Sequence, residues 1–302
     1  MFRAQKHITS TANSNSNVRL LSRQELGQLQ AHLWRMYKDI EAICIRHNLQ
    51  MCLAAGNVLG AVRHNGWIPW DDDLDVCMPR EDYDKFMNIY SKELPDKYIA
   101  YSVENENGPI IRFGKIIDRE TEFSQLIDLY PAHKEGVFID VFPYDNVPRS
   151  KFKHKLRQML AYGIMMIQNS VNQRKNATKE YASVLCSSHG GKNVYRIREM
   201  LGFLFGVVSL KTWFKLHDRL IRNCEKTGLL YCGASTTTGW IPIPESYLFP
   251  AKKVTLANGE DCLLPGEPEK YLDHVYGNWR TIPDDTDKWH HYVKEFKLPG
   301  TN

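Results

Sequence analysis

The sequence lacks several features that mark whole classes of protein. No run of about 18 apolar residues occurs among its 302 residues, so no helix is expected to span a bilayer. The N-terminal segment is rich in Ser, Asn and Thr and has no apolar h-region, so no signal peptide is expected. The net charge of +4 is too weak to argue for nucleic acid, although it suits anionic small molecules or an acidic membrane surface. We therefore expect a cytoplasmic protein, either free or peripheral on the inner face of the cytoplasmic membrane.

The cysteines do not form a recognisable framework. There are seven of them and no CxxC pair, and Cys44, Cys52 and Cys77 lie inside apolar runs. This pattern favours buried free thiols in a reducing compartment over disulfides or a zinc site.

Residues 21–148 have the pattern of a small mixed α/β unit. Residues 1–20 form a polar segment without periodicity, which predicts a disordered tail. Ser22 and Glu25 match the S-x-x-E capping box, and apolar residues spaced three and four apart predict a helix to about His47. A short strand at 51–55, a helix after Gly56 and a helix after Pro79 are expected next. Further strands are predicted at 73–78, 98–103, 110–117 and 136–142.

Residues 149–302 read as a mainly helical region followed by a C-terminal lid, and we expect them to complete the same catalytic unit. Periodicity predicts helices over 150–172 and 195–226. The most apolar segment, MLGFLFGVVSLKTWF, is interpreted as a buried core helix. Basic residues flank it, so a helix lying at an acidic lipid surface is the alternative.

The aspartates at 71, 72, 73 and 75 are the most informative feature of the chain. If this segment is extended, Asp71, Asp73 and Asp75 share one face and Asp72 points away. Carboxylates this close repel one another unless a cation lies among them, and oxygen ligands suit Mg²⁺ or Mn²⁺. The alternative is a solvated acidic loop, which the flanking apolar residues make less favourable.

The residues upstream of the aspartates are suited to binding phosphate. Gly56 and Asn57 open a helix, whose free N–H groups can hold a phosphate. Arg63 and His64 lie one to two turns further on and could neutralise phosphate charge. Trp70, with Trp67, could contribute to an aromatic cage for a quaternary ammonium group, although packing is the alternative role for both.

A third carboxylate is expected from a strand further along the chain. Asp140 lies in the apolar segment GVFIDVFPYD, where an Asp is costly unless it is paired or binds a metal. A structural Asp bonded to backbone N–H groups or to an Arg is the alternative. Lys115, in IIRFGKIID, is either a phosphate contact or a surface lysine.

Together these segments closely resemble the LicD family of phosphocholine transferases of bacterial surface glycans, which are related to fukutin and fukutin-related protein. The resemblance begins with G-x-x-L-G-A-x-R-H-x-G-x-I-P-W-D-D-D-x-D at Gly56. It continues through MPREDYDKF, the strand with Lys115, GVFIDVFPYD and YLDHVYGNW, and it covers about residues 25–290. One departure is Asn57, where the family commonly has Thr or Ser, so the preference for the donor is open.

The resemblance implies a nucleotidyltransferase-like α/β fold, with a mixed sheet core in residues 21–148. It implies Mg²⁺ or Mn²⁺ held by Asp73 and Asp75, with Asp71 beside them and Asp140 as the third carboxylate. It also implies transfer of a phospho-alcohol, most often phosphocholine, from CDP-choline or another CDP-alcohol to a sugar hydroxyl of a cell-surface glycan or glycolipid. In such a reaction Asp140 could orient or deprotonate the hydroxyl, and His290 and His291 are either alternative bases or part of a C-terminal lid.

Two other functions remain open from the sequence. A related nucleotidyltransferase would move an NMP group and release pyrophosphate rather than CMP. A non-catalytic glycan-assembly protein of the same fold would show no metal-dependent turnover, and the intact D-x-D-x-D pattern argues against it.

Overall fold

The structure is a computed structural model that describes most of the chain. The described ranges are residues 19–94, 96–104, 110–125, 136–186, 188–222, 225–234, 240–284 and 291–300. The predicted N-terminal tail lies outside these ranges up to residue 18, as do Cys224 and His290. The described cysteines are free thiols, and Cys44, Cys52 and Cys77 are buried.

The first helix forms where the capping box predicts it. In α2 (Arg23–Arg46), the Ser22 hydroxyl accepts from the Glu25 backbone N–H while the Glu25 carboxylate accepts from the Ser22 backbone N–H. These bonds satisfy donors that the first helical turn leaves unpaired. The expected apolar stripe is buried in the main core and includes Leu29, Leu33, Met36, Tyr37, Ile40 and Ile43. The helix prediction is therefore confirmed to within one residue of its end.

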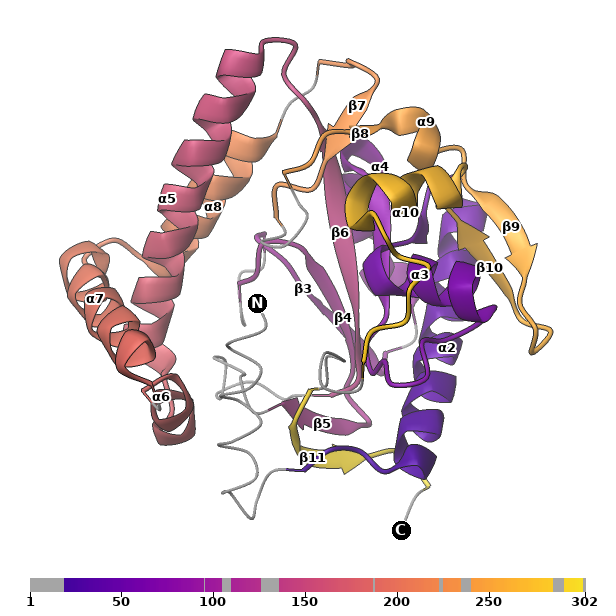
Figure 1. Cartoon of the computed structure of the whole chain (residues 1–302), viewed down its shortest axis with the longest axis horizontal. Coiled ribbons are helices and arrows are strands. Elements are labelled where there is room, and N and C mark those ends of the chain that lie inside the picture. The colour runs from indigo at the N-terminus through magenta and orange to yellow at the C-terminus, as the bar shows by residue number, and fades with distance from the viewer. Residues whose placement is uncertain are drawn as a thin grey trace.

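A mixed sheet occupies the centre of the molecule (Figure 1). Its main strands lie in the order β1-β2-β6-β4-β3. Strand β7 pairs with the C-terminal end of β6, and β8 pairs with β7. The β2–β6 pair is parallel and the others are antiparallel. The bounds are β1 Cys52–Leu53, β2 Asp75–Pro79, β3 Tyr98–Tyr101, β4 Gly114–Asp118, β6 Phe138–Asn146, β7 Leu229–Tyr231 and β8 Ile243–Pro244.

Helices lie on both sides of the sheet (Figure 1). Helix α4 (Arg80–Glu93) follows β2 directly and packs so closely on β4 that a Cβ on Gly114 would lie 3.1 Å from Met87 Sδ. Helix α3 (Ala55–His64) connects β1 to the segment before β2. In Figure 1 the sheet stands between α2 on one side and the helices α5 to α8 on the other.

The helical region lies in the middle of the chain, which corrects the predicted mainly helical C-terminal part. It comprises α5 (Lys151–Asn176), α6 (Lys179–Leu185), α7 (His189–Phe205) and α8 (Leu210–Ile221). None of the helices in the described ranges is both long enough and apolar enough to cross a membrane.

The segment MLGFLFGVVSLKTWF is not a buried core helix. It spans the end of α7, the turn at 206–209 and the start of α8. Met200, Phe203, Leu204 and Val207 are 57%, 65%, 56% and 88% exposed. Apolar composition alone could not distinguish a helix buried in the core from one that packs by one side only, on α5.

The C-terminal part returns to the core with short elements of both kinds. They are α9 (Glu245–Leu248), the hairpin of β9 (Lys252–Thr255) and β10 (Asp261–Leu264), α10 (Pro268–Tyr276), and β11 (Val293–Lys297), which pairs with β5 (Glu122–Gln125). Helix α10 packs on α3, and the Ala55 N–H donates to the Tyr271 hydroxyl at 3.3 Å. Ala55 and Tyr271, which are more than 200 positions apart in the sequence, therefore meet at the start of α3.

Candidate functional site

Strand register brings two predicted site residues to neighbouring positions. Asp75 opens β2 and pairs with Asp140 of β6, and Asp140 pairs in turn with Lys115 of β4. Directly paired residues point to the same face of a sheet. The three side chains therefore form a row across three strands, on the face opposite to the one that α4 covers at Gly114.

The other aspartates lie in a loop that leads into β2. The strand predicted at 73–78 begins only at Asp75, so strand alternation does not govern Asp71 and Asp73. Hydrogen bonds fix the loop instead: Gln30 Nε2 donates to the Asp71 carbonyl at 2.9 Å, and the Asp71 N–H donates to the Ile68 carbonyl at 3.0 Å.

Asn57 holds the same loop from the first turn of α3. Its Nδ2 donates to the Asp73 carbonyl at 3.1 Å, and its Oδ1 accepts from the Asp75 N–H at 2.6 Å. The side chain is 8% exposed. Both ends of the amide therefore bond the backbone on either side of Leu74, which makes Asn57 a support for the aspartates in this structure.

The carboxylates of the cluster carry unfavourable charge. Burial raises the pKa of Asp71 and Asp75 well above the usual value, and the charges of neighbouring carboxylates raise both further. Burial also raises the pKa of Asp73 and Asp140, although His291 opposes the rise at Asp73 and Lys115 opposes it at Asp140. The cluster would therefore gain from additional positive charge.

Two buried oxygens of the cluster differ in their surroundings: Asp71 Oδ2 has no hydrogen-bond partner, whereas Asp140 Oδ1 lies against a lysine. Asp71 Oδ2 lies 3.3 Å from the position that a Cβ on Gly56 would take, so a larger residue there would crowd this carboxylate. Asp140 Oδ1 forms an ion pair with Lys115 Nζ at 2.7 Å. Lys115 Nζ also lies 3.0 Å from the centre of the Phe138 ring, which fixes the lysine above β6.

A second hydrogen-bonded pair at the cluster joins residues that are far apart in the sequence. His291 Nδ1 lies 2.6 Å from Asp72 Oδ1, and Asp72 is 7% exposed. Burial alone lowers the pKa of His291, but the hydrogen bond and charge of Asp72, together with the charge of Asp73, outweigh burial and raise it. Strand reasoning gave no role to Asp72, because its partner is more than 200 residues away.

Tyr276, at the end of α10, also lies near the cluster. Burial raises its pKa, and the charges of Asp75, Asp71 and Asp73 raise it further. The residue belongs to the YLDHVYGNW segment on which the resemblance rests. That segment was the one signal in the sequence that pointed to it.

The other predicted substrate contacts have protein partners in this structure. Arg63 donates to the carbonyls of Trp279 at 2.8 Å and Thr281 at 3.3 Å, which fastens the segment after α10 to α3. His64 packs edge to face on Trp70, with ring centres 6.0 Å apart. Burial, and then the charge of Arg63, lower the pKa of His64.

No ready metal site is formed by three or more His, Cys, Asp or Glu side chains within the described ranges. The donor chemistry nevertheless suits a hard cation, because four carboxylates gather here and the buried Oδ2 of Asp71 lacks a hydrogen bond. Mg²⁺ commonly takes only one or two carboxylates and completes its shell with water and phosphate oxygens.

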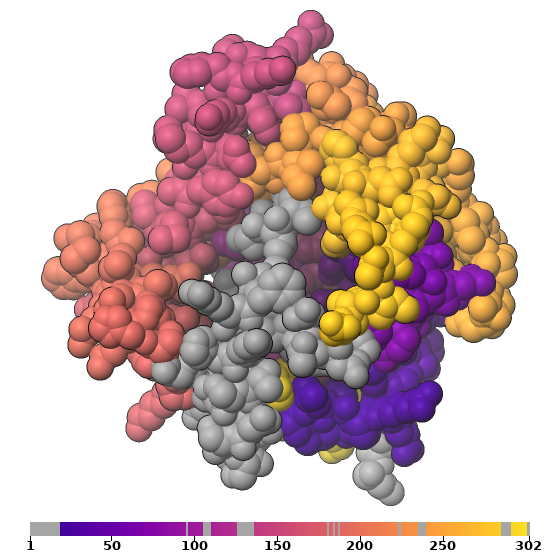
Figure 2. Space-filling view, viewed as in Figure 1, coloured from indigo at the N-terminus to yellow at the C-terminus, as the bar shows by residue number. Residues whose placement is uncertain are grey.

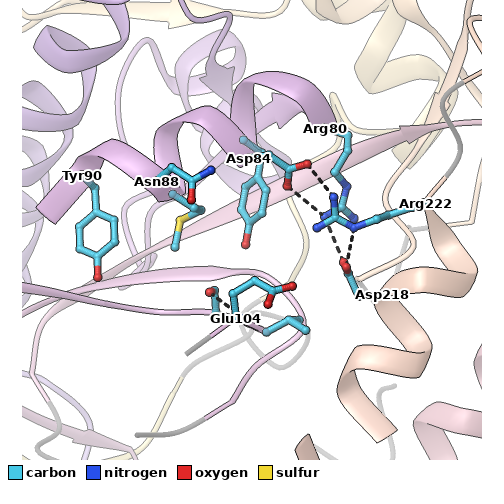
Figure 3. Close-up of a pocket in the computed structure, with 11 residues that line it drawn as sticks. Arg80, Asp84, Asn88, Tyr90, Glu104, Asp218 and Arg222 are labelled. Atoms are coloured by element: carbon cyan, nitrogen blue, oxygen red, sulfur yellow. Dashed lines mark hydrogen bonds and ion pairs between the residues drawn. The ribbon is translucent and has the colours of Figure 1, made fainter. Parts of the chain in front are cut away.

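A different charged cluster lies at the opposite end of β2 (Figure 3). Arg80 donates to both oxygens of Asp145, at 2.9 and 2.7 Å, and to Asp218 of α8 at 3.1 Å. Arg222 bonds Asp218 and, at 2.6 Å, Asp84. A cavity of about 350 Å³ opens beside these residues, between α4, α8 and the end of β3. Each carboxylate of this cluster has an arginine, unlike those around Asp75.

Comparison with known proteins gives a family for the central part of the chain. Residues 48–163 match the family described as LicD/FKTN/FKRP, nucleotidyltransferase domain. This range contains α3, β2, β4 and β6, and therefore Asp71, Asp73, Asp75 and Asp140.

Three relatives extend the similarity beyond this range. The lipopolysaccharide cholinephosphotransferase LicD of Haemophilus influenzae is 24% identical over 264 residues, which cover 84% of this chain and 91% of the relative. Uncharacterized proteins of Rickettsia typhi and Rickettsia prowazekii are 28% and 26% identical, over 66% and 68% of this chain and 60% and 73% of their own lengths. Residues 48–163 are thus a domain of the LicD/FKTN/FKRP nucleotidyltransferase family, and the chain is a distant homologue of LicD cholinephosphotransferase.

Proposed function

We propose that this chain transfers a phospho-alcohol from a CDP-activated donor to a sugar hydroxyl of a cell-surface glycan or glycolipid. Phosphocholine is the phospho-alcohol that we expect it to prefer. The observation that carries the proposal is the pairing of Asp75 with Asp140, which gathers buried, mutually repelling carboxylates beside Lys115. The name of the Haemophilus relative, lipopolysaccharide cholinephosphotransferase, supports the choice of choline phosphate and of a lipopolysaccharide-type acceptor.

Mg²⁺ or Mn²⁺ fits the carboxylate cluster by its donor chemistry. Asp73 and Asp75 would hold the ion, with Asp71 beside them and Asp140 as the third carboxylate. When bound, the ion would supply positive charge against the donor diphosphate. The buried Oδ2 of Asp71, which has no hydrogen bond, and the repulsion among the carboxylates support this assignment.

Asp140 and Lys115 are suited to handle the acceptor. The acceptor oxygen forms a bond to the phosphorus that carries the alcohol, while the bond from that phosphorus to the CMP oxygen breaks. Asp140 accepts the proton of the acceptor hydroxyl, and Lys115, 2.7 Å away, favours the ionised form of Asp140 before the transfer. The ammonium group of Lys115 can also contact a phosphate oxygen.

The remaining proposed contacts surround this centre. Gly56 leaves room beside Asp71, and its backbone N–H, in the first turn of α3, can donate to a phosphate oxygen. His291 is held by Asp72 and offers an alternative base. The rings of His64 and Trp70 pack edge to face and could contact the alcohol part of the donor. Arg63 could neutralise phosphate charge if it released the Trp279 carbonyl and bonded a phosphate oxygen of the donor.

The experiment is a donor panel with the full chain. CDP-choline, CDP-glycerol and CDP-ribitol are each incubated with a glycan acceptor and Mg²⁺, and CMP and pyrophosphate are both measured. We expect CMP release, largest with CDP-choline, which a chelator abolishes and added Mg²⁺ restores. Asp75→Ala should abolish release, whereas Asp261→Asn, at a half-buried aspartate of the β9–β10 hairpin, should not change it.

The panel separates the alternatives through its products. A parallel incubation replaces the CDP-alcohol by a nucleoside triphosphate, and release of pyrophosphate there, without CMP release from any CDP-alcohol, would favour a nucleotidyltransferase that moves an NMP group. Absence of metal-dependent turnover with every CDP-alcohol would favour a non-catalytic glycan-assembly protein. Turnover by Asp75→Ala equal to that of the unmodified chain would overturn the proposed site.

A further inference from the structure

Charge is distributed very unevenly along this chain. Residues 151–222, which contain α5 to α8, hold 14 of the 39 Lys and Arg residues but only 3 of the 35 Asp and Glu residues. Their net charge is +11, and that of the rest of the chain is −7. Helix α5 has six basic residues and no acidic residue in 26 positions. The mild overall charge therefore conceals a strongly basic helical region.

The same region exposes large apolar side chains in a stripe along α5. Phe152, Leu156, Met159 and Met166 are 76%, 39%, 63% and 45% exposed. Their spacing of four, three and seven places them on one side of the helix. Ala161, which is fully buried, faces the other way, toward the aromatic cluster of Tyr231 and Trp240.

Helix α7 lies on the continuation of this stripe. Gly202 packs against Ser170, the next position of the stripe after Met166, and a Cβ on Gly202 would lie 2.5 Å from the Ser170 carbonyl oxygen. The helices are therefore in close backbone contact. Because Gly202 faces α5, the opposite side of α7 faces outward, in the direction in which the α5 stripe points.

The outward side of α7 is itself apolar. Ile197, Met200 and Leu204, spaced three and four apart, are 51%, 57% and 56% exposed, and Val207 in the following turn is 88% exposed. In Figure 2, α5 and α7 form the left-hand edge of the molecule, away from the yellow C-terminal segment. The two stripes thus belong to one side of the molecule, which we call the α5–α7 face: Phe152, Leu156, Met159, Met166, Ile197, Met200, Leu204 and Val207.

We propose that the α5–α7 face docks on a membrane surface that contains anionic lipid. Lys and Arg residues flank both stripes, so their charges can contact lipid headgroups while the apolar side chains enter the interface. A second copy of this chain is a poor occupant, because it would bring two regions of net charge +11 together. This inference rests on the surface alone and does not depend on the proposed reaction.

Vesicle sedimentation of the full chain tests the proposal. We expect it to sediment with vesicles of phosphatidylcholine and phosphatidylglycerol, much less with phosphatidylcholine alone, and less at high salt. The paired substitutions Met200→Ser with Leu204→Ser, and Phe152→Ser with Met159→Ser, should each weaken partitioning by at least about tenfold, because buried methylene groups are lost.

Ile45→Ser is the matched control, because Ile45 is an equally exposed apolar residue (68%) on α2. It should bind as the unmodified chain does, and circular dichroism should show that every variant is folded. Failure of the unmodified chain to sediment with anionic vesicles would overturn the proposal. So would binding that depends on salt but is unchanged in both paired variants. A dimer in solution that the same substitutions dissociate would assign the face to a second copy instead.

Discussion

The two ends of β2 carry buried charge that is organised in opposite ways. At its start, Asp75 lies among Asp71, Asp73 and Asp140, and burial and mutual repulsion raise the pKa of Asp75. At its end, Arg80 and Arg222 bond the carboxylates beside them. The strand is five residues long, so the two clusters lie roughly 16 Å apart.

The difference separates a site suited to binding from one suited to stability. A buried ion pair with every partner present is self-sufficient, and loss of one partner leaves a costly unpaired charge. A cluster of carboxylates without enough cations is strained in isolation and gains from a ligand that brings positive charge. Substitutions at the two clusters should therefore affect different properties.

The largest effect is expected on activity at Asp75. Asp75→Asn keeps the size of the side chain and removes one of the repelling charges. CMP release should fall by at least about a hundredfold, as for loss of a preorganised electrostatic group. The free energy of unfolding, measured in urea, should be unchanged or higher. An Asp75→Asn protein that is active but clearly less stable would reverse the roles assigned to the two ends of β2.

Arg80→Met should produce the converse result. It leaves Asp145, which is fully buried, and Asp218 without their shared arginine. The expected loss is about 3–5 kcal/mol of unfolding free energy, measured by urea denaturation. Arg280→Met is the control, because Arg280 pairs with Asp273 and Glu269 at the surface and should change stability little. Equal losses in the two variants would contradict a special role for the Arg80 cluster.

Lys115→Met should reduce activity more than stability. It removes the cation 2.7 Å from Asp140, so the carboxylate is less readily ionised before transfer. We expect CMP release to fall by about 10- to 100-fold. Lys97→Met is the matched control, because Lys97 likewise lies near a carboxylate, 3.6 Å from Asp118, and over the ring of Tyr98. It does not belong to the row of Asp75, Asp140 and Lys115. A similar loss of activity in Lys97→Met would indicate a general effect on the sheet.

Asn57 tests whether the support of the aspartate loop matters. Asn57→Ala removes both bonds to the loop backbone and should lower the unfolding free energy by about 1–3 kcal/mol, with reduced turnover. Asn57→Thr replaces the amide by a hydroxyl that can form one of the two bonds, so it should retain more of both stability and turnover than Asn57→Ala. If Asn57→Ala were as stable as the unmodified chain and changed only the affinity for the donor, Asn57 would be a direct substrate contact instead.

Local features of the sequence predicted much of the fold. The capping box and apolar stripe predicted α2, and the apolar segment around Asp140 predicted a strand, which the structure places beside β2. These signals depend on neighbouring positions, where periodicity and caps act directly. The site residues remain predictions, although the structure brings Asp75, Asp140 and Lys115 into one row.

The features that the sequence did not reveal depend on distant contacts. Asp72 meets His291, and Arg80 meets Asp218, across more than 130 residues, and no local pattern specifies such partners. The exposure of Met200 and Leu204 depended likewise on the close approach of Gly202 to α5, which apolar composition does not encode.

The smallest effect on stability is expected at Glu25, which forms an ion pair with Arg19 near the surface. Its hydrogen bond with Arg19 lowers the pKa of Glu25 to about 2 in spite of partial burial. A lowered folded-state pKa contributes stability that is present above the ordinary value of 4.5 and is lost as the pH falls toward 2. Solvent screening should keep the contribution below about 1 kcal/mol. Urea denaturation of Glu25→Gln and the unmodified chain should therefore differ slightly near neutral pH and converge in acid. If the difference in unfolding free energy between the two proteins grew on acidification, the Arg19–Glu25 pair would not be a weak surface pair, and the contrast with the buried clusters would be lost.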